Sequence, residues 1–203
     1  MRVLAVFLVF VAASFESRAS VLDVSPDGSG AYPDLRQALQ AAQSGDTIRL
    51  ADGVFTGPGN RNLIVGGVLT ISSAGGVAAS CALDLEAGGR GFLIYSLPGT
   101  LIRIEGITLR GGEPRSLPED QLPGYGGGLA LKPLSPGGFL HVENCVFEEN
   151  AADAGGGAFV WGGEALFRDC VFRANVATDA AADYCGQCAA GSRVRFDSSL
   201  LYD

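Results

Sequence analysis

The chain has 203 residues, a formal net charge of −8 at pH 7 and a sequence pI of about 4.6. Hydrophobic residues make up 47% of it and charged residues 18%, which is typical of a folded chain with a substantial core and not of a disordered one. The acidic balance argues against nucleic acid as a partner, because phosphate binding requires a basic face.

Residues 1–19 predict a secretory signal peptide. Arg2 gives a positive start, residues 3–13 form an apolar run, and small residues just before the cut favour cleavage after Ala19. The alternative is that this segment forms a buried N-terminal strand. The apolar run is too short to span a bilayer and no later stretch is long enough. We therefore expect an exported mature chain, residues 20–203, without a membrane span.

A helix is predicted near the start of the mature chain, after a short strand at residues 22–24. Asp34 suits the positive end of a helix, and apolar residues at helical spacing follow it to about Gln43, with Gly45 as the stop signal. The apolar positions are Leu35, Ala38, Leu39 and Ala42. The first coil of a solenoid exposes its hydrophobic end, so we expect this short amphipathic helix to cap it.

From residue 46 onward the sequence predicts short strands separated by glycines. These strands are too short and too closely spaced for βαβ units, and a sandwich of hairpins is the competing all-β architecture. The runs are residues 47–50, 62–65, 68–72, 81–85, 91–95, 101–104 and 107–109.

Residues 126–175 contain two copies of one pattern. Cys145 and Cys170 differ by 25 positions (170−145), and so do Phe147 and Phe172 (172−147). A period in the twenties built from short apolar strands is typical of a solenoid. It argues against the sandwich, because a sandwich gives no reason for identical offsets.

Alignment of three successive coils predicts which positions point inward. One position between the inward ones holds Gly106, Asn144 and Asp169, residue types that readily adopt a left-handed backbone and so bend a strand without a loop. The inward stacks are Ile104, Val142 and Phe167; Ile107, Cys145 and Cys170; and Leu109, Phe147 and Phe172.

The outward positions support the same register. Glu143 is expected beside Arg168, and Glu148 beside Arg173, as opposite charges on adjacent strands. Asn150 and Asn175, at the strand ends, could stack as an amide ladder or could mark turns.

The five cysteines of the chain divide into two groups. Cys145 and Cys170 stand at equivalent positions of neighbouring coils, where the Cβ atoms are too far apart for a relaxed disulfide, so we expect stacked buried thiols. Cys185 and Cys188 form one CxxC. For this pair a local or loop-to-loop disulfide, in which Cys81 could take part, is favoured over zinc or redox chemistry.

The repeat residues resemble a known family. Residues 147–150 and 172–175 fit an FxxN motif, while residues 126–129 and 155–158 resemble its companion, GGA followed by an aliphatic residue. Together they are similar to the repeats of polymorphic outer-membrane proteins, whose exported passenger domains are right-handed parallel β-helices. The resemblance implies that residues 20–203 form an all-β, right-handed parallel β-helix solenoid.

Residues 27–55 are similar to the opening segment of pectin-lyase-like β-helix proteins, which include pectinesterases. Residues 106–109 match the strand that precedes the catalytic coils of pectinesterases. However, residues 126–131 lack the glutamine expected there, and no aspartate-bearing segment of the family pattern follows. The resemblance therefore supports the fold and carries over no catalytic set.

Candidate catalytic residues are acidic. Enzymes that cleave polysaccharides on this fold need carboxylates, or a basic residue such as Arg103, that converge on one groove. Glu105 and Glu143 are expected on one outer face and are the candidates for a carboxylate pair. Because Arg168 interrupts the row and Asp169 serves the turn, we favour a solvated, register-setting face over a catalytic pair.

Three further features are candidates for binding. His141 is the single histidine, so a histidine metal cluster is excluded, and we expect it to face solvent. Tyr95 and Trp161 end comparable strands and could stack on sugar rings, although packing at the corner of a coil is the favoured alternative. Residues 113–125 form a proline-containing insertion, and such loops often carry function. We predict no metal or other cofactor.

Two functions remain. The first is an exported surface, adhesion or glycan-binding scaffold without an evident active site, with polysaccharides or cell-surface glycans as partners. The second is a carbohydrate-active enzyme, either a polysaccharide lyase or a pectinesterase-like esterase, in truncated form. The final coil reaches Ser199 at the cysteine position and then stops, which predicts either a truncated product or end-to-end self-association. We expect the protein to be secreted or at a cell surface.

Overall fold

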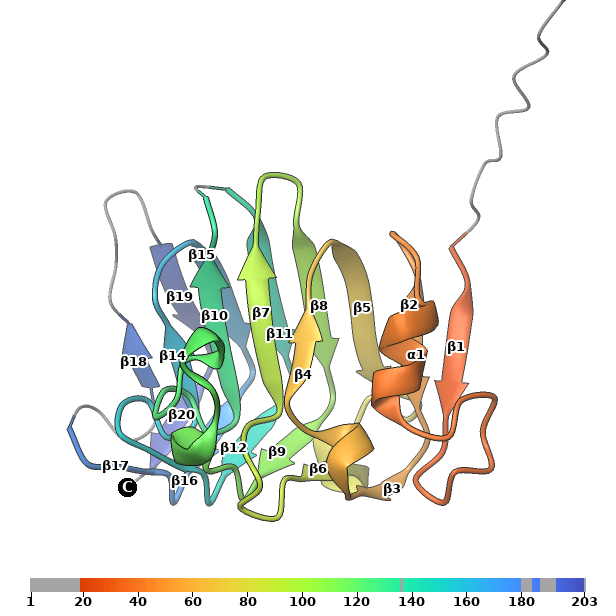
Figure 1. Ribbon diagram of the computed structural model, residues 1–203, viewed down its shortest axis with the longest axis horizontal. Coiled ribbons are helices and arrows are strands. Elements are labelled where there is room, and N and C mark those ends of the chain that lie inside the picture. The colour runs from red at the N-terminus through yellow and green to blue at the C-terminus, as the bar shows by residue number, and fades with distance from the viewer. Residues whose placement is uncertain (1–18, 136, 180–183, 187–192, 203) are drawn as a thin grey trace, which may run out of the picture.

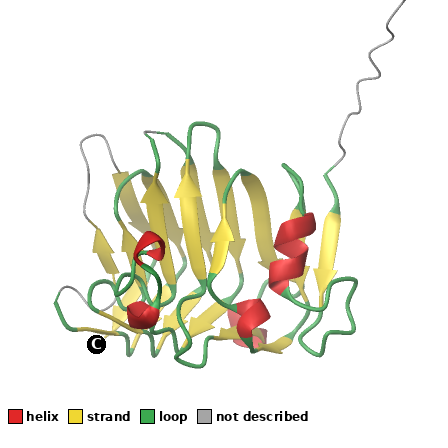
Figure 2. Cartoon of the chain, viewed as in Figure 1, coloured by secondary structure: helices red, strands yellow, loops and turns green. Residues whose placement is uncertain are grey.

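The computed structural model describes residues 19–135, 137–179, 184–186 and 193–202 (Figure 1). The predicted signal peptide, apart from Ala19, lies outside these residues. Strands dominate the described part, and its helical segments are short (Figure 2). The described residues contain no helix that is long and apolar enough to cross a membrane.

The main strands form three parallel sheets. The seven-stranded sheet contains, in spatial order, β1 (Val21–Val24), β2 (Thr47–Leu50), β5 (Val68–Ser73), β8 (Leu101–Glu105), β11 (Phe139–Glu143), β15 (Glu164–Arg168) and β19 (Arg193–Asp197). The six-stranded sheet contains β3 (Gly53–Phe55), β6 (Cys81–Asp84), β9 (Thr108–Arg110), β12 (Val146–Glu148), β16 (Val171–Arg173) and β20 (Leu200–Tyr202). The five-stranded sheet contains β4 (Leu63–Val65), β7 (Phe92–Ser96), β10 (Leu129–Pro133), β14 (Ala158–Val160) and β18 (Tyr184–Gly186).

The remaining elements are small. β13 (Ala151–Ala152) pairs with β17 (Val176–Ala177), and α1 (Leu35–Ala41) is the α-helix. The 3-10 turns are η1 (Pro58–Asn60), η2 (Ala78–Ser80), η3 (Pro114–Ser116) and η4 (Glu119–Gln121).

The chain visits the three main sheets in a fixed rotation. From β2 it passes to the six-stranded sheet, then to the five-stranded sheet, and then returns to the seven-stranded sheet at β5. Each full rotation adds one strand to each sheet, and the chain advances along the long axis of the molecule, as the colours of Figure 1 show. This arrangement of parallel strands is compatible with the parallel β-helix expected from the sequence, and it excludes hairpins between the main strands.

The predicted inward stacks are confirmed. Val142 pairs in register with both Ile104 and Phe167, and all three are buried. The rings of Phe147 and Phe172 stack with centroids 4.5 Å apart and an interplanar angle of 4°. One continuous apolar core therefore runs through successive coils.

The predicted left-handed corner is also confirmed. Gly106, Asn144 and Asp169 have φ values of 66°, 51° and 51°. A second left-handed corner follows the strands of the six-stranded sheet, where Glu149 and Ala174 have φ values of 55° and 51°. The sequence did not indicate this corner, because glutamate and alanine have no preference for that conformation.

Asn150 and Asn175 form an amide ladder immediately after the second corner. The Asn150 amide donates to the Leu109 carbonyl and to Asn175 Oδ1, both at 3.0 Å, and the Asn175 amide donates to the Phe147 carbonyl at 3.0 Å. Asn150 Oδ1 also accepts a bond of 2.9 Å from the Gly112 N–H. These buried bonds fix the coil-to-coil spacing and satisfy backbone groups that the bend would otherwise leave unpaired.

The glycine runs of the repeat motif lie where successive coils come close together. A Cβ on Gly128 would stand 2.6 Å from the Gly157 carbonyl oxygen and 2.8 Å from the Phe147 ring. A Cβ on Gly91, one coil earlier, would stand 2.7 Å from the Gly128 oxygen. Only glycine fits these positions, which gives the GGA motif a steric explanation.

Helix α1 begins as predicted and ends earlier. Asp34 caps it by accepting the Gln37 N–H at 2.8 Å. The residue after the helix, Ala42, is already extended, with φ −63° and ψ 142°, so Gly45 does not end the helix. The Asp46 carboxylate accepts the Gln43 N–H at 2.8 Å and so holds the chain in a turn directly after the helix.

The outward charge pairs lie in the predicted register, but they differ in contact. Glu148 and Arg173 are register partners and form an ion pair of 2.5 Å. Glu143 and Arg168 are also register partners, yet the described residues show no ion pair between them.

The cysteine prediction is correct for one pair and wrong for Cys81. Cys145 and Cys170 are buried free thiols, and so is Cys81. Because Ala82 pairs with Thr108, Cys81 adjoins Ile107 and extends the same inward stack as a buried side chain. Burial raises the pKa of the Cys81 thiol to about 12 and that of Cys170 to about 11. The predicted disulfide of the CxxC motif involves Cys188, which lies outside the described residues.

Candidate functional site

The outer side of the five-stranded sheet carries a row of large side chains. Lys132 pairs in register with Tyr95. Because Leu131 pairs with Val160, the next residue, Trp161, adjoins Lys132 on the other side. Trp161 is 41% exposed, and Tyr95 and Lys132 are half-buried. Tyr95 and Trp161 thus share one outward row, with the only lysine of the chain between them.

A second outward row on this sheet is apolar and covered. Leu93, Ala130 and Phe159 are buried on the outside of the sheet, separate from the main core. The insertion at residues 113–125 covers them and contributes Leu122 to their cluster, with Tyr95 and Tyr125 packed against it. We call this set, which also includes Ala154, the outer apolar cluster. In Figure 1 the short helix η4 of the insertion lies over β10 and β14, and η3 lies below it.

The insertion adds a third aromatic side chain, the half-buried Tyr125, beside the outward row of Tyr95 and Trp161. The Tyr125 ring lies 4.7 Å from that of Phe159 and 6.0 Å from that of Trp161, centroid to centroid. The Lys132 ammonium lies 6.0 Å from the Tyr95 ring centroid, at the limit of a cation–π contact. We call Tyr95, Tyr125, Lys132 and Trp161 the aromatic surface.

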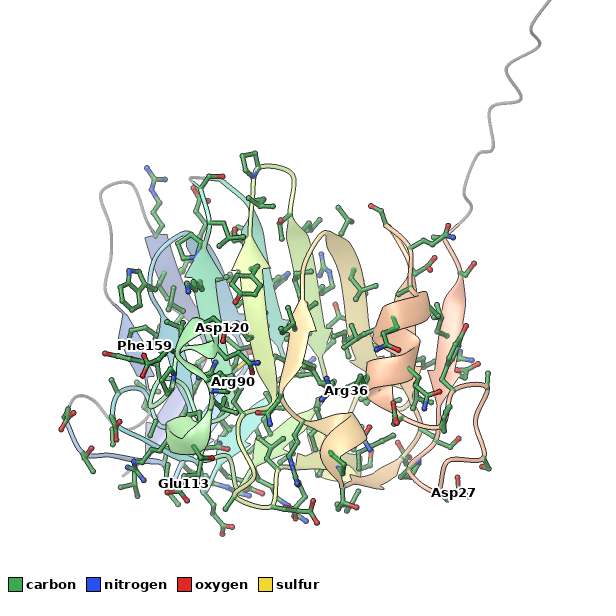
Figure 3. All side chains as sticks on the ribbon, viewed as in Figure 1. Asp27, Arg36, Arg90, Glu113, Asp120 and Phe159 are labelled. Atoms are coloured by element: carbon green, nitrogen blue, oxygen red, sulfur yellow. The ribbon has the colours of Figure 1, made fainter. Side chains whose placement is uncertain are left out.

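Several polar contacts fix the insertion in place. The Tyr95 hydroxyl donates to the Asp120 carbonyl at 3.1 Å. Arg115 bonds to Asp153 at 2.7 Å and to Glu113 at 2.8 Å, so it ties the start of the insertion to the next coil. Figure 3 shows Arg90 and Phe159 near Asp120, which belongs to the insertion.

Arg90 makes the most extensive of these contacts. It is 1% exposed, and its guanidinium donates to the carbonyls of Gln121, Leu122, Tyr125 and Gly126. No sequence pattern indicated Arg90, Lys132 or Tyr125 as a site residue. An arginine within a glycine-rich turn between two apolar strands was the only signal for Arg90, and it did not show which segment the side chain would meet.

The acidic candidates lie together on a different sheet. Glu105 and Glu143 are register partners on β8 and β11, on the outer side of the seven-stranded sheet. Arg103 lies 3.3 Å from the Glu105 carboxylate, and His141 Nε2 lies 3.5 Å from that of Glu143. Both carboxylates therefore have a basic neighbour on their own strand. Asp169 follows Arg168, the register partner of Glu143, and is exposed at the left-handed corner.

The prediction that His141 faces solvent is wrong. Its side chain lies on the outer side of the sheet, but only 7% of the residue is exposed, and Nε2 has no hydrogen-bond partner among the described residues. Its register neighbours, Arg103 and Leu166, flank it, and the Phe139 ring lies 6.3 Å away. Burial, together with the charges of Arg103 and Arg168, lowers the pKa of His141, while Glu143 and Glu105 act in the opposite direction.

The described residues contain no group of three or more His, Cys, Asp or Glu side chains that could hold a metal ion. No model of a known protein family matches the chain, and no curated protein matches it in sequence. The candidate sites therefore stand on the geometry of the chain itself, which offers an aromatic surface on one sheet and a carboxylate pair on another.

Proposed function

We propose that the mature chain is an exported, right-handed parallel β-helix of the pectin-lyase-like type that binds glycans through the aromatic surface. The rotation of the chain through three parallel sheets supports this architecture. The amide ladder of Asn150 and Asn175 supports the likeness to FxxN repeats, because it gives the motif's asparagine a structural role. Secretion and a place at the cell surface belong to this proposal and rest on the N-terminal sequence.

In this proposal α1 is the N-terminal cap. Leu35 and Ala38 are buried in the main core, Leu39 packs against it from the same helix, and Ala42 packs against it just after the helix. Asn60, from a later turn, accepts the Leu35 N–H at 2.9 Å and so joins the helix to the coils. A helix that buries its apolar stripe against the first strands performs the function that the exposed end of a solenoid requires.

The observation that carries the binding proposal is the row of Tyr95, Lys132 and Trp161, flanked by Tyr125. Exposed aromatic rings supply flat apolar faces together with polar tips, and such faces suit the apolar sides of sugar rings. Lys132 adds three N–H donors between two of the rings. Among the described residues, the Lys132 ammonium group forms no ion pair or hydrogen bond, so these donors are accessible to hydroxyl or carboxylate oxygens.

Glycan-array binding followed by titration tests the proposal. We expect Trp161→Ala to weaken binding of any glycan captured by the wild-type chain about tenfold, as expected for an aromatic hot spot. Val54→Ala is the matched control, because Val54 is also an exposed apolar side chain but lies on the six-stranded sheet. Equal losses in the two variants, or an array without any captured glycan, would overturn the proposal.

A second function is favoured by a specific observation, the side-by-side placement of Glu105 and Glu143 with Arg103 3.3 Å from Glu105. Paired carboxylates with a basic neighbour can supply acid–base chemistry to a polysaccharide. Incubation with pectin and alginate, read as unsaturated or de-esterified product, tests this enzyme. Turnover that Glu143→Gln abolishes and Glu148→Gln leaves intact would establish it; the absence of turnover in the wild type would reject it.

End-to-end self-association also belongs to the proposal. β18, β19 and β20 lie at the same end of their respective sheets, and Leu200 and Leu201 on β20 are 50% and 56% exposed. An apolar strand at a sheet edge can pair with another chain. Light scattering that shows only a monomer at every protein concentration would contradict end-to-end self-association.

A further inference from the structure

The buried guanidinium of Arg90 has an unusual set of partners. Its three nitrogens make four hydrogen bonds, and every acceptor is a backbone carbonyl between Gln121 and Gly126. Two of the bonds are those from Nε to the Gly126 oxygen, at 3.2 Å, and from Nη2 to the Tyr125 oxygen, at 2.5 Å. Arg90 itself lies just before β7, so a residue of one coil holds the end of an insertion that belongs to the next coil.

Among the described residues, these carbonyls solvate the positive charge of Arg90 without a carboxylate partner. The ion pairs of the described residues do not include Arg90. Burial lowers its pKa to about 10, so the guanidinium remains charged at neutral pH. A buried cation is tolerated only where polar groups replace its water shell. The arrangement of the insertion and the burial of Arg90 therefore depend on each other.

The backbone of the insertion has a left-handed conformation at Leu122, next to the guanidinium of Arg90. Leu122 has a φ of 53°, a left-handed conformation that is unfavourable for leucine. Its carbonyl accepts from Arg90, and its side chain is buried in the outer apolar cluster. A strained residue persists only where its surroundings over-determine it, and here both the carbonyl and the side chain are held.

We propose that Arg90 is the positioning residue of the aromatic surface: it locks residues 121–126 onto the outer side of the five-stranded sheet and so places Tyr125 beside Trp161. A planar guanidinium can reach four carbonyls that diverge around it, because its donors point outward in a fixed fork. A lysine ammonium cannot span the same set. The effect on glycan binding rests on the proposed function, whereas the effect on the insertion does not.

The substitution Arg90→Lys tests the lock, since it keeps the charge and changes the donor geometry. Glutamyl endopeptidase can cleave after Glu119, which lies in η4 of the insertion. Trp161 is the only tryptophan, so its quenching by acrylamide reports on the aromatic surface. We expect Glu119 cleavage to rise about tenfold or more, because proteolysis follows the population of the opened segment. We also expect stronger quenching of Trp161 and weaker glycan binding, with an unchanged far-UV circular dichroism spectrum.

Arg61→Lys is the matched control. Arg61 is a partly buried arginine one coil earlier, and its guanidinium bonds to Glu86 and to the Leu85 carbonyl, both outside the insertion. Unchanged Glu119 cleavage in Arg90→Lys, or an increase that Arg61→Lys reproduces, would overturn the inference. Faster cleavage after Glu119 with unaltered glycan binding would support the role of Arg90 in holding the insertion. The same result would count against the aromatic surface as the binding site, so the two proposals can fail separately.

Discussion

His141 shows how a single residue can acquire a property that its sequence neighbours do not indicate. It is a polar side chain on the outer side of a strand, where solvent exposure is the ordinary expectation. In the folded chain it lies between Arg103 and Leu166 from the adjacent strands, with Phe139 two residues before it. Because burial disfavours the imidazolium, the folded state lowers the pKa of His141 below its ordinary value.

The lowered pKa gives a pH dependence of known sign. At a pH below the ordinary histidine value the unfolded chain binds a proton that the folded chain resists, so the free energy of unfolding decreases as the pH falls through about 6.5. We expect urea midpoints to decline between about pH 8 and about pH 5.5. His141→Leu, which introduces the residue already present at position 166, should remove most of this decline.

The lowered pKa values of Asp23 and Asp46 place the titration of these two carboxyls well below the range of this test. Hydrogen bonds from Arg49 and from the Gln43 N–H hold the pKa values of Asp23 and Asp46 below 3.8. A carboxyl with a lowered pKa loses its contribution to stability only as the pH falls below that value. A decline near pH 6.5 that persists unchanged in His141→Leu would show that another group is responsible.

Among the elements, α1 depends on two caps of different origin. Asp34, the residue before the helix, accepts the Gln37 N–H, and Asn60, from η1, accepts the Leu35 N–H. The Asn60 side chain also donates to the Thr56 carbonyl at 2.8 Å and is buried. The local cap could be predicted from the helix sequence, whereas the distant cap depends on a turn 25 residues away.

We expect the two caps to differ in their contribution to stability. Asp34→Ala removes a partly exposed cap and should lower the free energy of unfolding by about 1 kcal/mol. Asn60→Ala leaves the N–H of the buried Leu35 without its acceptor and the Thr56 carbonyl without its donor, and should cost about 2–3 kcal/mol. Urea unfolding followed by circular dichroism measures both values. A smaller loss for Asn60→Ala than for Asp34→Ala would contradict the view that the distant cap anchors the helix.

The strands show a similar division between local and distant signals. Apolar runs such as residues 47–50 and 101–104 predicted β2 and β8 to within one residue. The strand at Gly53–Phe55 was missed, because a glycine and two apolar residues form too short a pattern. The fold of the insertion could not be predicted either, since its two 3-10 turns are stabilised by side chains of other coils.

At the scale of the whole molecule, the inward stacks connect all coils into one core. Cys81, Cys145 and Cys170 lie in the same stack at three different levels, and burial raises the pKa of each thiol. Thiolate is the reactive form, so these thiols should react only after the coils open.

This arrangement predicts cooperative labelling. Iodoacetamide treatment across a urea series, with peptide mapping, should modify Cys81, Cys145 and Cys170 with one common midpoint that coincides with the loss of circular dichroism. The native chain should show little labelling at these positions. Labelling of Cys81 at low urea, well before the other two, would show that the early coils unfold separately from the repeat.

The sequence by itself determined the coil period, the inward stacks and the first left-handed corner, because each depends on residue type at a repeated position. Gly106, Asn144 and Asp169 carry that signal without any knowledge of their neighbours. The candidate residues Tyr95, Trp161, Glu105 and Glu143 could also be named, since alternation along a strand assigns each to the outer side. Their functions remain predictions.

Only the tertiary structure showed which side chains and segments cover the outer sides of the sheets. The burial of His141, the second corner at Glu149 and Ala174, and the docking of the insertion all result from contacts between coils. Arg90 is the clearest example, because its four acceptors follow it by 31 to 36 positions in the chain. Local sequence patterns report on the backbone of one segment, whereas burial and hydrogen-bond partners depend on segments that meet only after folding.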